Sequence, residues 1–433
     1  MRRTNLISIA VLVAVAFLPL VAAAADPPLA ITNARIVTVS GAEIPRGTIV
    51  VRDGKITAVG ANVSVPSGAK VIDATGMTVY PGMIDAYTTL GLVEVPTIAG
   101  SVDTSEGGTY NPTADAADSV YPHSELIPIT RVVGVTTVLT GTRGGFIGGQ
   151  AAAVNLAGWT SQEMVLQRGA ALLVNLPHWS RVSAQQLGPR PGQTGPPARQ
   201  ERERYAQQQM NELKDYIARA RAYTAMKDAA AKAGQKFAVE REWEAMIPFV
   251  RDSRPWIAPA DTADQIKDAI VFGKDQKINL VLTGGAEAWK VAKELADSKV
   301  PVLIDSTDMP RSDRDPYDSG YANAAALAKA GAKFAFSTGS SSDVRSLPFL
   351  AALAEAYGLT SEQAVRAITL SPAEILGIND RVGSIEVGKV ANLVVAGGDI
   401  LDVRTPIKQV IIAGKTIEMR SKHTDLYDKF KVR

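Results

Sequence analysis

The chain has 433 residues, and 46 Lys and Arg against 44 Asp and Glu give it a formal net charge of +2. With 46% hydrophobic and 21% charged residues it has a globular composition, and its balanced charge argues against a nucleic-acid-binding surface, which needs clustered Lys and Arg. The absence of cysteine excludes disulfides, thiolate metal sites and a cysteine nucleophile. Three histidines, His123, His178 and His423, are the imidazoles available as metal ligands or bases.

The first 25 residues have the pattern of a secretory signal. Arg2 and Arg3 precede an apolar run from Ile7 to Val21, and Ala23-Ala24-Ala25 offers small residues for cleavage. The run is about 15 residues long, which is short for a membrane-spanning helix. An uncleaved N-terminal anchor is the alternative. No other stretch is apolar enough to cross a membrane, so we expect a secreted or periplasmic protein with no membrane span after cleavage of residues 1–25.

Both ends of the mature chain are rich in short strand-like runs separated by turns. In residues 26–78, the pair Asp53-Gly54 joins two such runs and strongly indicates a hairpin. In residues 383–420, a second hairpin is expected around Ala413-Gly414. We therefore expect one small β-sandwich domain assembled from both ends of the chain.

Residues 79–382 alternate strand-like and helix-like segments, as parallel α/β folds do. Eight strands over about 300 residues fit a (β/α)8 TIM barrel. An open doubly wound sheet remains an alternative on periodicity alone. The expected strands are Thr78–Asp85, Val135–Thr140, Ala151–Asn155, Ala171–Leu176, Pro255–Ala258, Ile278–Leu282, Val300–Asp305 and Lys333–Thr338.

An insertion at about residues 187–240 interrupts this alternation. Leu187–Gln200 is rich in Pro, Gly and Gln, whereas Glu201 to about Ala233 is highly charged and free of Gly and Pro. We expect an exposed helical insertion beside the barrel mouth that acts as a lid or a partner surface. A solvated helix without such a role is the alternative. Residues 421–433 are expected to form a polar tail that exposes His423.

Two motifs at opposite ends of the barrel region resemble those of the amidohydrolase superfamily. Val71–Ala86 (VIDATGMTVYPGMIDA) is similar to the opening strand of that superfamily, and Leu370–Gly377 (LSPAEILG) with Gly383–Lys389 (GSIEVGK) is similar to its closing segment. The hairpin Thr48–Gly60 is also typical. The chain most resembles the imidazolonepropionase-like and prolidase-like bacterial members. This resemblance implies a (β/α)8 barrel with a β-sandwich, and hydrolysis of C–N bonds in cyclic amides or related substrates.

The resemblance also implies Zn²⁺ or another divalent metal, which makes hydroxide from water and polarises the scissile carbonyl. The family binds it with a His-x-His pair on the first strand, a Lys or Glu on the fourth, single histidines on the fifth and sixth, and an Asp on the eighth. The fourth strand here ends without a Lys or Glu, and the other positions hold Tyr87, Thr89, Pro259, Gly284 and Gly339. Because these residue types do not replace imidazole and carboxylate ligands, we expect no metal and no other cofactor.

Other residues offer weaker routes to catalysis. His178 lies near the end of the fourth strand, and Asp305 and Asp343 could form a carboxylate site for a harder cation. Packing, helix capping and loop ion pairs are the plainer interpretations. Ser340-Ser341-Ser342 lacks a histidine placed to activate a serine, and such triplets usually form turns. The Gly-rich loop Gly141–Gln150 lacks a phosphate-binding pattern; by the same resemblance it would line the barrel mouth, and a tight connection is the alternative.

The leading hypothesis is an exported amidohydrolase-superfamily protein that keeps the scaffold and has lost the metal, a pseudoenzyme or binding protein. It would hold a small molecule or peptide in a mouth pocket lined by Tyr87, Thr89, Thr140, His178, Asp305 and Thr338. It could instead associate with a metal-bearing amidohydrolase relative through the charged insertion. The alternative is an active hydrolase of C–N bonds in cyclic amides or dipeptide-like substrates, using non-standard ligands or a metal-free reaction of Asp305, Asp343 and His178.

Overall fold

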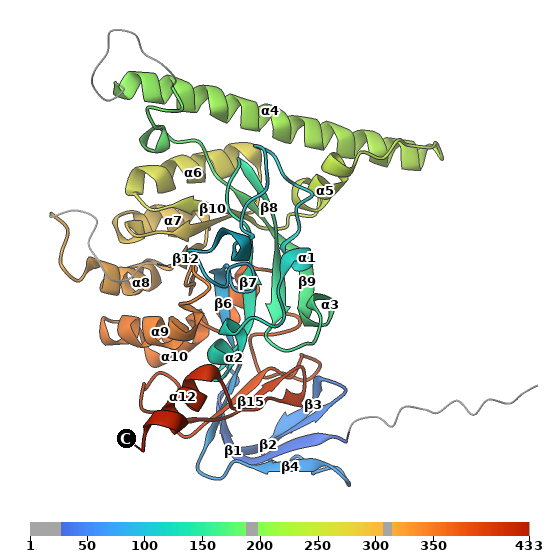
Figure 1. Cartoon of the computed structure of the whole chain (residues 1–433), viewed down its shortest axis with the longest axis vertical. Helices are drawn as coiled ribbons and strands as arrows, with labels where there is room; N and C mark the ends of the chain where they lie inside the picture. Colours follow the sequence, from blue (N-terminus) through green and yellow to red (C-terminus); the bar gives the residue numbers. More distant parts are fainter. Residues whose placement is uncertain (1–26, 188–197, 306–313, 433) are drawn as a thin grey trace, which may run out of the picture.

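The computed structural model describes residues 27–187, 198–305 and 314–432. The predicted signal segment, residues 1–25, lies outside the described residues, as does most of the Pro-rich stretch that follows Leu187. A sheet built from both ends of the chain lies at one end of the molecule, a barrel-like sheet follows it, and helix α4 (Arg199–Lys232) crosses the opposite end (Figure 1).

The first sheet joins the two ends of the chain, as predicted. Its strand order is β16-β15-β14-β5-β1-β2-β3, with β4 paired to β1. The turn Asp53-Gly54 between β2 and β3 has φ values of 51° and 76°, which a tight hairpin turn requires, so this hairpin is confirmed. The strands are β1 Leu29–Ile36, β2 Ile44–Arg52, β3 Lys55–Gly60, β4 Lys70–Asp73, β5 Thr78–Pro81, β14 Leu393–Ala396, β15 Ile407–Ile412 and β16 Lys415–Thr416.

The expected strand Thr78–Asp85 is divided between the two sheets at Gly82. Residues before Gly82 pair with β14, and residues after it pair with β7 (Val135–Thr140) of the barrel. A side chain at Gly82 would place its Cβ 2.1 Å from Thr136 Oγ1, so only glycine allows the backbone to pass so close to the next strand. The division is a correction to the prediction, and its cause is this close approach.

The second sheet contains eight strands in the order β13-β12-β11-β10-β9-β8-β7-β6 and is nearly closed. The Gly339 N–H, just beyond β13, donates to the Tyr87 carbonyl on β6 at 3.0 Å. The predicted eight-strand barrel is therefore confirmed. Its strands are β6 Met83–Thr88, β7 Val135–Thr140, β8 Ile147–Asn155, β9 Val165–Val174, β10 Trp256–Ala260, β11 Leu280–Gly284, β12 Val302–Ile304 and β13 Phe334–Phe336.

One strand departs from the expected parallel repeat. β8 runs antiparallel to both β7 and β9, whereas the other neighbouring pairs in this sheet are parallel. Only residues 141–146 connect β7 to β8, and a parallel crossover needs about a dozen residues or more. The expectation of a uniformly parallel barrel is wrong here because the Gly-rich loop closes a hairpin.

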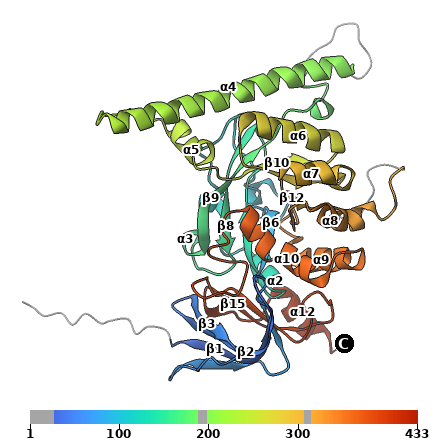
Figure 2. The same cartoon turned by 180° about the vertical axis from the view of Figure 1, so that it is seen from behind.

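Helices α6 to α9 stack along one side of the barrel (Figures 1 and 2). α6 begins at a capping box of Thr262 and Gln265. Among the described residues, no helix is both long and apolar enough to span a membrane. Besides α4, the α-helices are α1 Ala116–Ser119, α2 Leu126–Arg131, α3 Ser161–Met164, α5 Arg241–Val250, α6 Ala263–Gln276, α7 Ala292–Ser298, α8 Ser319–Ala330, α9 Leu347–Ala356, α10 Ser361–Ala367, α11 Leu370–Ile375 and α12 Lys422–Phe430.

The charged insertion forms the helix that the sequence predicts, and aromatic rings hold it to the barrel. The Tyr216 ring on α4 stacks on Tyr110, with ring centroids 4.2 Å apart, and lies 4.9 Å from Trp243 on α5. The Tyr223 hydroxyl donates to Glu244 on α5 at 2.7 Å. α4 is therefore a packed helix with one buried stripe, and its predicted role as a lid or partner surface remains a prediction.

The C-terminal residues expected as a polar tail contain a helix. α12 begins after Ser421, whose Oγ accepts the Thr424 N–H at 3.4 Å. Leu426 and Phe430 on this helix are each 42% exposed. The capping box of Ser421 and Thr424 is the local sequence signal for the start of this helix.

Candidate functional site

A cavity of about 240 Å³ opens where the carboxyl ends of the barrel strands converge. This is the face on which barrel enzymes place their sites. Its volume lies below the range of about 300–1,000 Å³ that holds drug-sized ligands, so it suits a smaller molecule. Its wall consists of Tyr87, Thr142, Arg143, Gly144, Leu173, Val174, Asn175, Ile257, Pro259, Thr283 and Asp305.

The structure brings together only some of the residues predicted to line this pocket. Tyr87 and Asp305 lie in the cavity wall. Thr89 and Thr140 are buried in the barrel and do not line the cavity. Thr338 does not line it either, and its hydroxyl donates a hydrogen bond to Asp85 on β6. The sixth residue, His178, lies in a separate region, described below.

Asp85 is a buried carboxyl at the closure of the barrel that the sequence prediction did not identify. It is fully buried on β6, and its carboxylate accepts the Thr338 hydroxyl at 2.6 Å and the N–H groups of Thr338 and Tyr87 at 3.1 and 3.2 Å. Burial raises the pKa of Asp85 to about 7, against the lowering effect of these hydrogen bonds. A carboxyl inside an otherwise apolar strand was the available signal. Asp85 links β6 to the end of β13, where the barrel closes.

Arg143 is the second residue that the prediction missed. It comes from the Gly-rich loop after β7, and its guanidinium donates to the Gly339 carbonyl across the mouth. Within the described parts of the chain, no carboxylate forms an ion pair with it. Asn175 holds the same loop, because its Nδ2 donates to the Gly144 and Gly145 carbonyls at 3.3 and 2.8 Å. The loop therefore presents a cation to the cavity from a fixed position.

The positions expected for metal ligands lie at the strand ends, but they do not fit a divalent ion. Gly284 and Gly339 have φ values of 95° and 63°, a backbone conformation that costs a residue with a side chain about 1–2 kcal/mol. A Cβ at Gly284 would also lie 2.3 Å from Asp261 Oδ1. Over residues 27–187, 198–305 and 314–432, no group of three or more His, Asp or Glu side chains is arranged to hold a metal. Tyr87 and Pro259 contribute neither imidazole nor carboxylate.

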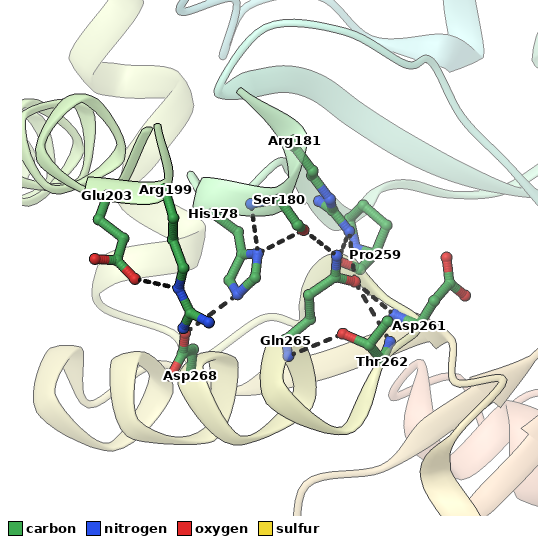
Figure 3. A network of polar contacts seen from close by, with 10 residues as sticks. All are labelled: His178, Ser180, Arg181, Arg199, Glu203, Pro259, Asp261, Thr262, Gln265 and Asp268. Carbon is green, nitrogen blue, oxygen red and sulfur yellow. Dashed lines mark hydrogen bonds and ion pairs between the residues drawn. The ribbon is translucent and has the colours of Figure 1, made fainter. Parts of the chain in front are cut away.

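His178 belongs to a structural network between the η2 turn (Trp179–Arg181) and α6 (Figure 3). Its Nδ1 accepts the Ser180 N–H at 3.2 Å and lies 2.7 Å from Ser180 Oγ, which in turn accepts from Gln265 Nε2 at 3.0 Å. Its Nε2 lies 3.5 Å from Asp268 Oδ2. Burial lowers the pKa of His178. The ring caps η2 and contacts α6, and it does not line the mouth cavity.

This capping role predicts a modest effect of substitution. His178→Ala removes the acceptor for the Ser180 N–H and should lower the free energy of unfolding by about 1 kcal/mol. His178→Asn is the matched control, because asparagine is a good capping residue and should restore most of the loss. Urea unfolding of the two variants measures the difference. Equal losses in both would show that the imidazole acts through another contact.

The other catalytic candidates lie apart from the cavity. Asp343 is exposed before the η4 turn (Val344–Ser346) and makes no capping hydrogen bond. Ser340 and Ser342 place their hydroxyl oxygens 3.2 Å apart in the turn after β13. The Ser340 carbonyl accepts the Thr88 hydroxyl at 2.8 Å, so this turn helps to close the barrel.

Sequence and structure comparisons both relate this chain to amidohydrolases. A model of the amidohydrolase family matches residues 266–417. The D-hydantoinase of Geobacillus stearothermophilus is 39% identical over 85 residues, which are 18% of this chain and only 17% of the length of that curated relative. A solved amidohydrolase from Thermotoga maritima MSB8 has a TM-score of 0.77 at 26% identity and covers 90% of this chain and 100% of its own. A solved prolidase, at 16% identity and a TM-score of 0.53, covers 91% of this chain and 100% of its own and shows the same fold.

Proposed function

Because the chain belongs to the amidohydrolase superfamily and has its hydrolase scaffold, we propose that it binds a small molecule at the barrel mouth without hydrolysing it by the superfamily's metal route. The observation that carries this proposal is the donor set at the strand ends. The positions at which the superfamily's metal ligands are expected hold Tyr87, Thr89, Pro259, Gly284 and Gly339.

The backbone supports the same conclusion. At Gly284 and Gly339 the positive φ angles disfavour any side chain, so these two positions are shaped for glycine. Asp85, the buried carboxyl nearest to the closure of the barrel, uses both oxygens on the Thr338 and Tyr87 groups. It therefore serves the closure of the barrel.

The cavity itself supports binding. It is enclosed on several sides by apolar groups, including Leu173, Ile257 and Pro259, and it carries a few polar groups at defined positions. Such a combination is the usual architecture of a small-molecule site. Export through residues 1–25 and association with a metal-bearing relative remain predictions beside this proposal.

The test is metal content and hydrolysis on the mature protein purified without chelator, before and after loading with Zn²⁺ or Mn²⁺ and removal of free metal. We expect no stoichiometric metal and no hydrolysis of cyclic amides or dipeptides above a buffer control. One tightly held ion per chain, with hydrolysis that Asp305→Asn or Asp85→Asn removes, would instead establish an active hydrolase with non-standard ligands. A surface variant, Asp402→Asn, controls for unspecific loss.

A further inference from the structure

Building on the proposed function, we propose that the ligand of the mouth cavity is a small zwitterion, with a carboxylate bound by Arg143 and an ammonium bound by Asp305 and Asn175. An α-amino acid with a short side chain has this chemistry. The inference rests on one cation, two acceptors and an apolar wall that face the same cavity.

Arg143 provides the site for the carboxylate. One of its terminal nitrogens donates to the Gly339 carbonyl, which holds the side chain across the mouth. The guanidinium also hydrogen-bonds the Tyr87 hydroxyl, so Arg143 and Tyr87 form one polar edge of the cavity wall. Arginine binds carboxylates through paired, charge-assisted hydrogen bonds, so the guanidinium is suited to an anionic ligand group.

Asn175 and Asp305 provide the site for the ammonium. Because Asn175 Nδ2 donates to two carbonyls of the Gly-rich loop, its amide orientation is set and Oδ1 is left as an acceptor. Asp305 lies in the same wall and is half-buried. A third wall residue, Thr283, is 5% exposed, and its Oγ1 has no hydrogen-bond partner in the described structure.

The charges and size of the cavity exclude other ligand classes. A dianion would meet the Asp305 carboxylate, and a simple cation would meet the Arg143 guanidinium, so each would be repelled by one wall. The volume of about 240 Å³ is too small for a drug-sized molecule. The apolar part of the wall, formed by Leu173, Ile257 and Pro259, suits a short aliphatic side chain.

Isothermal titration of the mature chain with L-alanine and L-valine tests this inference. Each is compared with its amide, which lacks the carboxylate, and with its N-acetyl derivative, which lacks the ammonium. We expect the free amino acids to bind at least about tenfold more tightly than either capped form, since each cap removes one charge-assisted contact. This series uses the unmodified protein, so it does not depend on whether any variant folds.

Variants then assign each end of the ligand to its residue. Arg143→Gln should remove the preference for the amino acid over its amide, and Asp305→Asn should remove the preference over the N-acetyl form. Arg404→Gln is the matched control, because the Arg404 side chain is 86% exposed in the turn before β15, and it should leave both preferences unchanged.

Two outcomes would overturn the inference in distinguishable ways. Equal binding of capped and free forms, or no binding of any of them, in a folded protein without metal would reject the zwitterion. Retained metal together with hydrolysis of C–N bonds would reject the proposed function, and the inference would fall with it.

Discussion

Asp85→Asn is expected to remove most of the change in stability between about pH 4 and pH 8. Burial raises the pKa of Asp85 from its ordinary value of 3.8 to about 7, so the folded state binds this proton more tightly than the unfolded state. The group therefore favours folding at pH 4 and loses that contribution as the pH rises through 7. A shift of this size corresponds to a loss on the order of 4 kcal/mol in the free energy of unfolding.

The asparagine variant tests this assignment because it resembles the protonated acid. Its Oδ1 can still accept the N–H groups of Tyr87 and Thr338, and its Nδ2 can donate to the Thr338 hydroxyl. Asp85→Asn should therefore be more stable than the parent at pH 8 and about equally stable at pH 4. Urea unfolding followed by the fluorescence of the five tryptophans, over pH 4 to 8, measures this difference.

Asp85→Ala is the contrasting variant. It leaves the buried N–H groups of Tyr87 and Thr338 without their acceptor, so at pH 4 it should be about 3 kcal/mol less stable than the parent. Because it also lacks the titrating carboxyl, its stability should change little with pH, and its deficit relative to the parent should shrink toward pH 8. If Asp85→Asn keeps the pH dependence of the parent, another group is responsible for it and Asp85 is not the titrating residue.

The second large effect is expected at Gly284. Gly284→His places a side chain on a backbone with φ of 95°, where its Cβ would meet Asp261 Oδ1 at 2.3 Å. The positive φ costs about 1–2 kcal/mol, and the contact requires Asp261 to move. We expect the free energy of unfolding to fall by at least about 2 kcal/mol. A histidine at this expected ligand position would thus destabilise the barrel end.

Gly331→Ala separates the two causes. Gly331 has a φ of 78°, and a Cβ there would meet nothing within 4 Å, so the substitution carries the conformational cost alone. Gly284→Ala should lower the urea midpoint more than Gly331→Ala does. A Gly284→His variant as stable as the parent would mean that the strand end can accept imidazole, and the argument against metal ligation at this position would fail.

Local chemistry explains which predictions of the fold are confirmed. The Asp53-Gly54 turn and α4 depend on short-range signals, namely positive φ at a tight turn and a charged segment free of Gly and Pro. The division of a strand at Gly82 depends on the close approach of Thr136 on the next barrel strand, which residue spacing does not reveal. The antiparallel direction of β8 follows from the short connection of residues 141–146, and hydrophobic periodicity alone does not indicate strand direction.

The residues of the candidate site also fall into those that the sequence predicted and those that only the structure revealed. Tyr87 and Asp305 were predicted because the barrel motif places them at strand ends, where the carboxyl face of the barrel lies. Arg143 was missed because its role depends on a loop that crosses the mouth to Gly339, 196 positions away along the chain. His178 was expected to reach the mouth, whereas its contacts with Ser180 and Asp268 hold it in the network beside α6.

The sequence by itself determined the superfamily motifs, the two regions of different architecture, and the residue types at the expected metal positions. These features are carried by residue identity and short-range spacing. Only the tertiary structure decided which charged and polar groups share the cavity, because Arg143, Asn175 and Asp305 come from separate loops and strand ends that the barrel brings together. It also decided that Asp85 is fully buried, since burial depends on the strands that close around it.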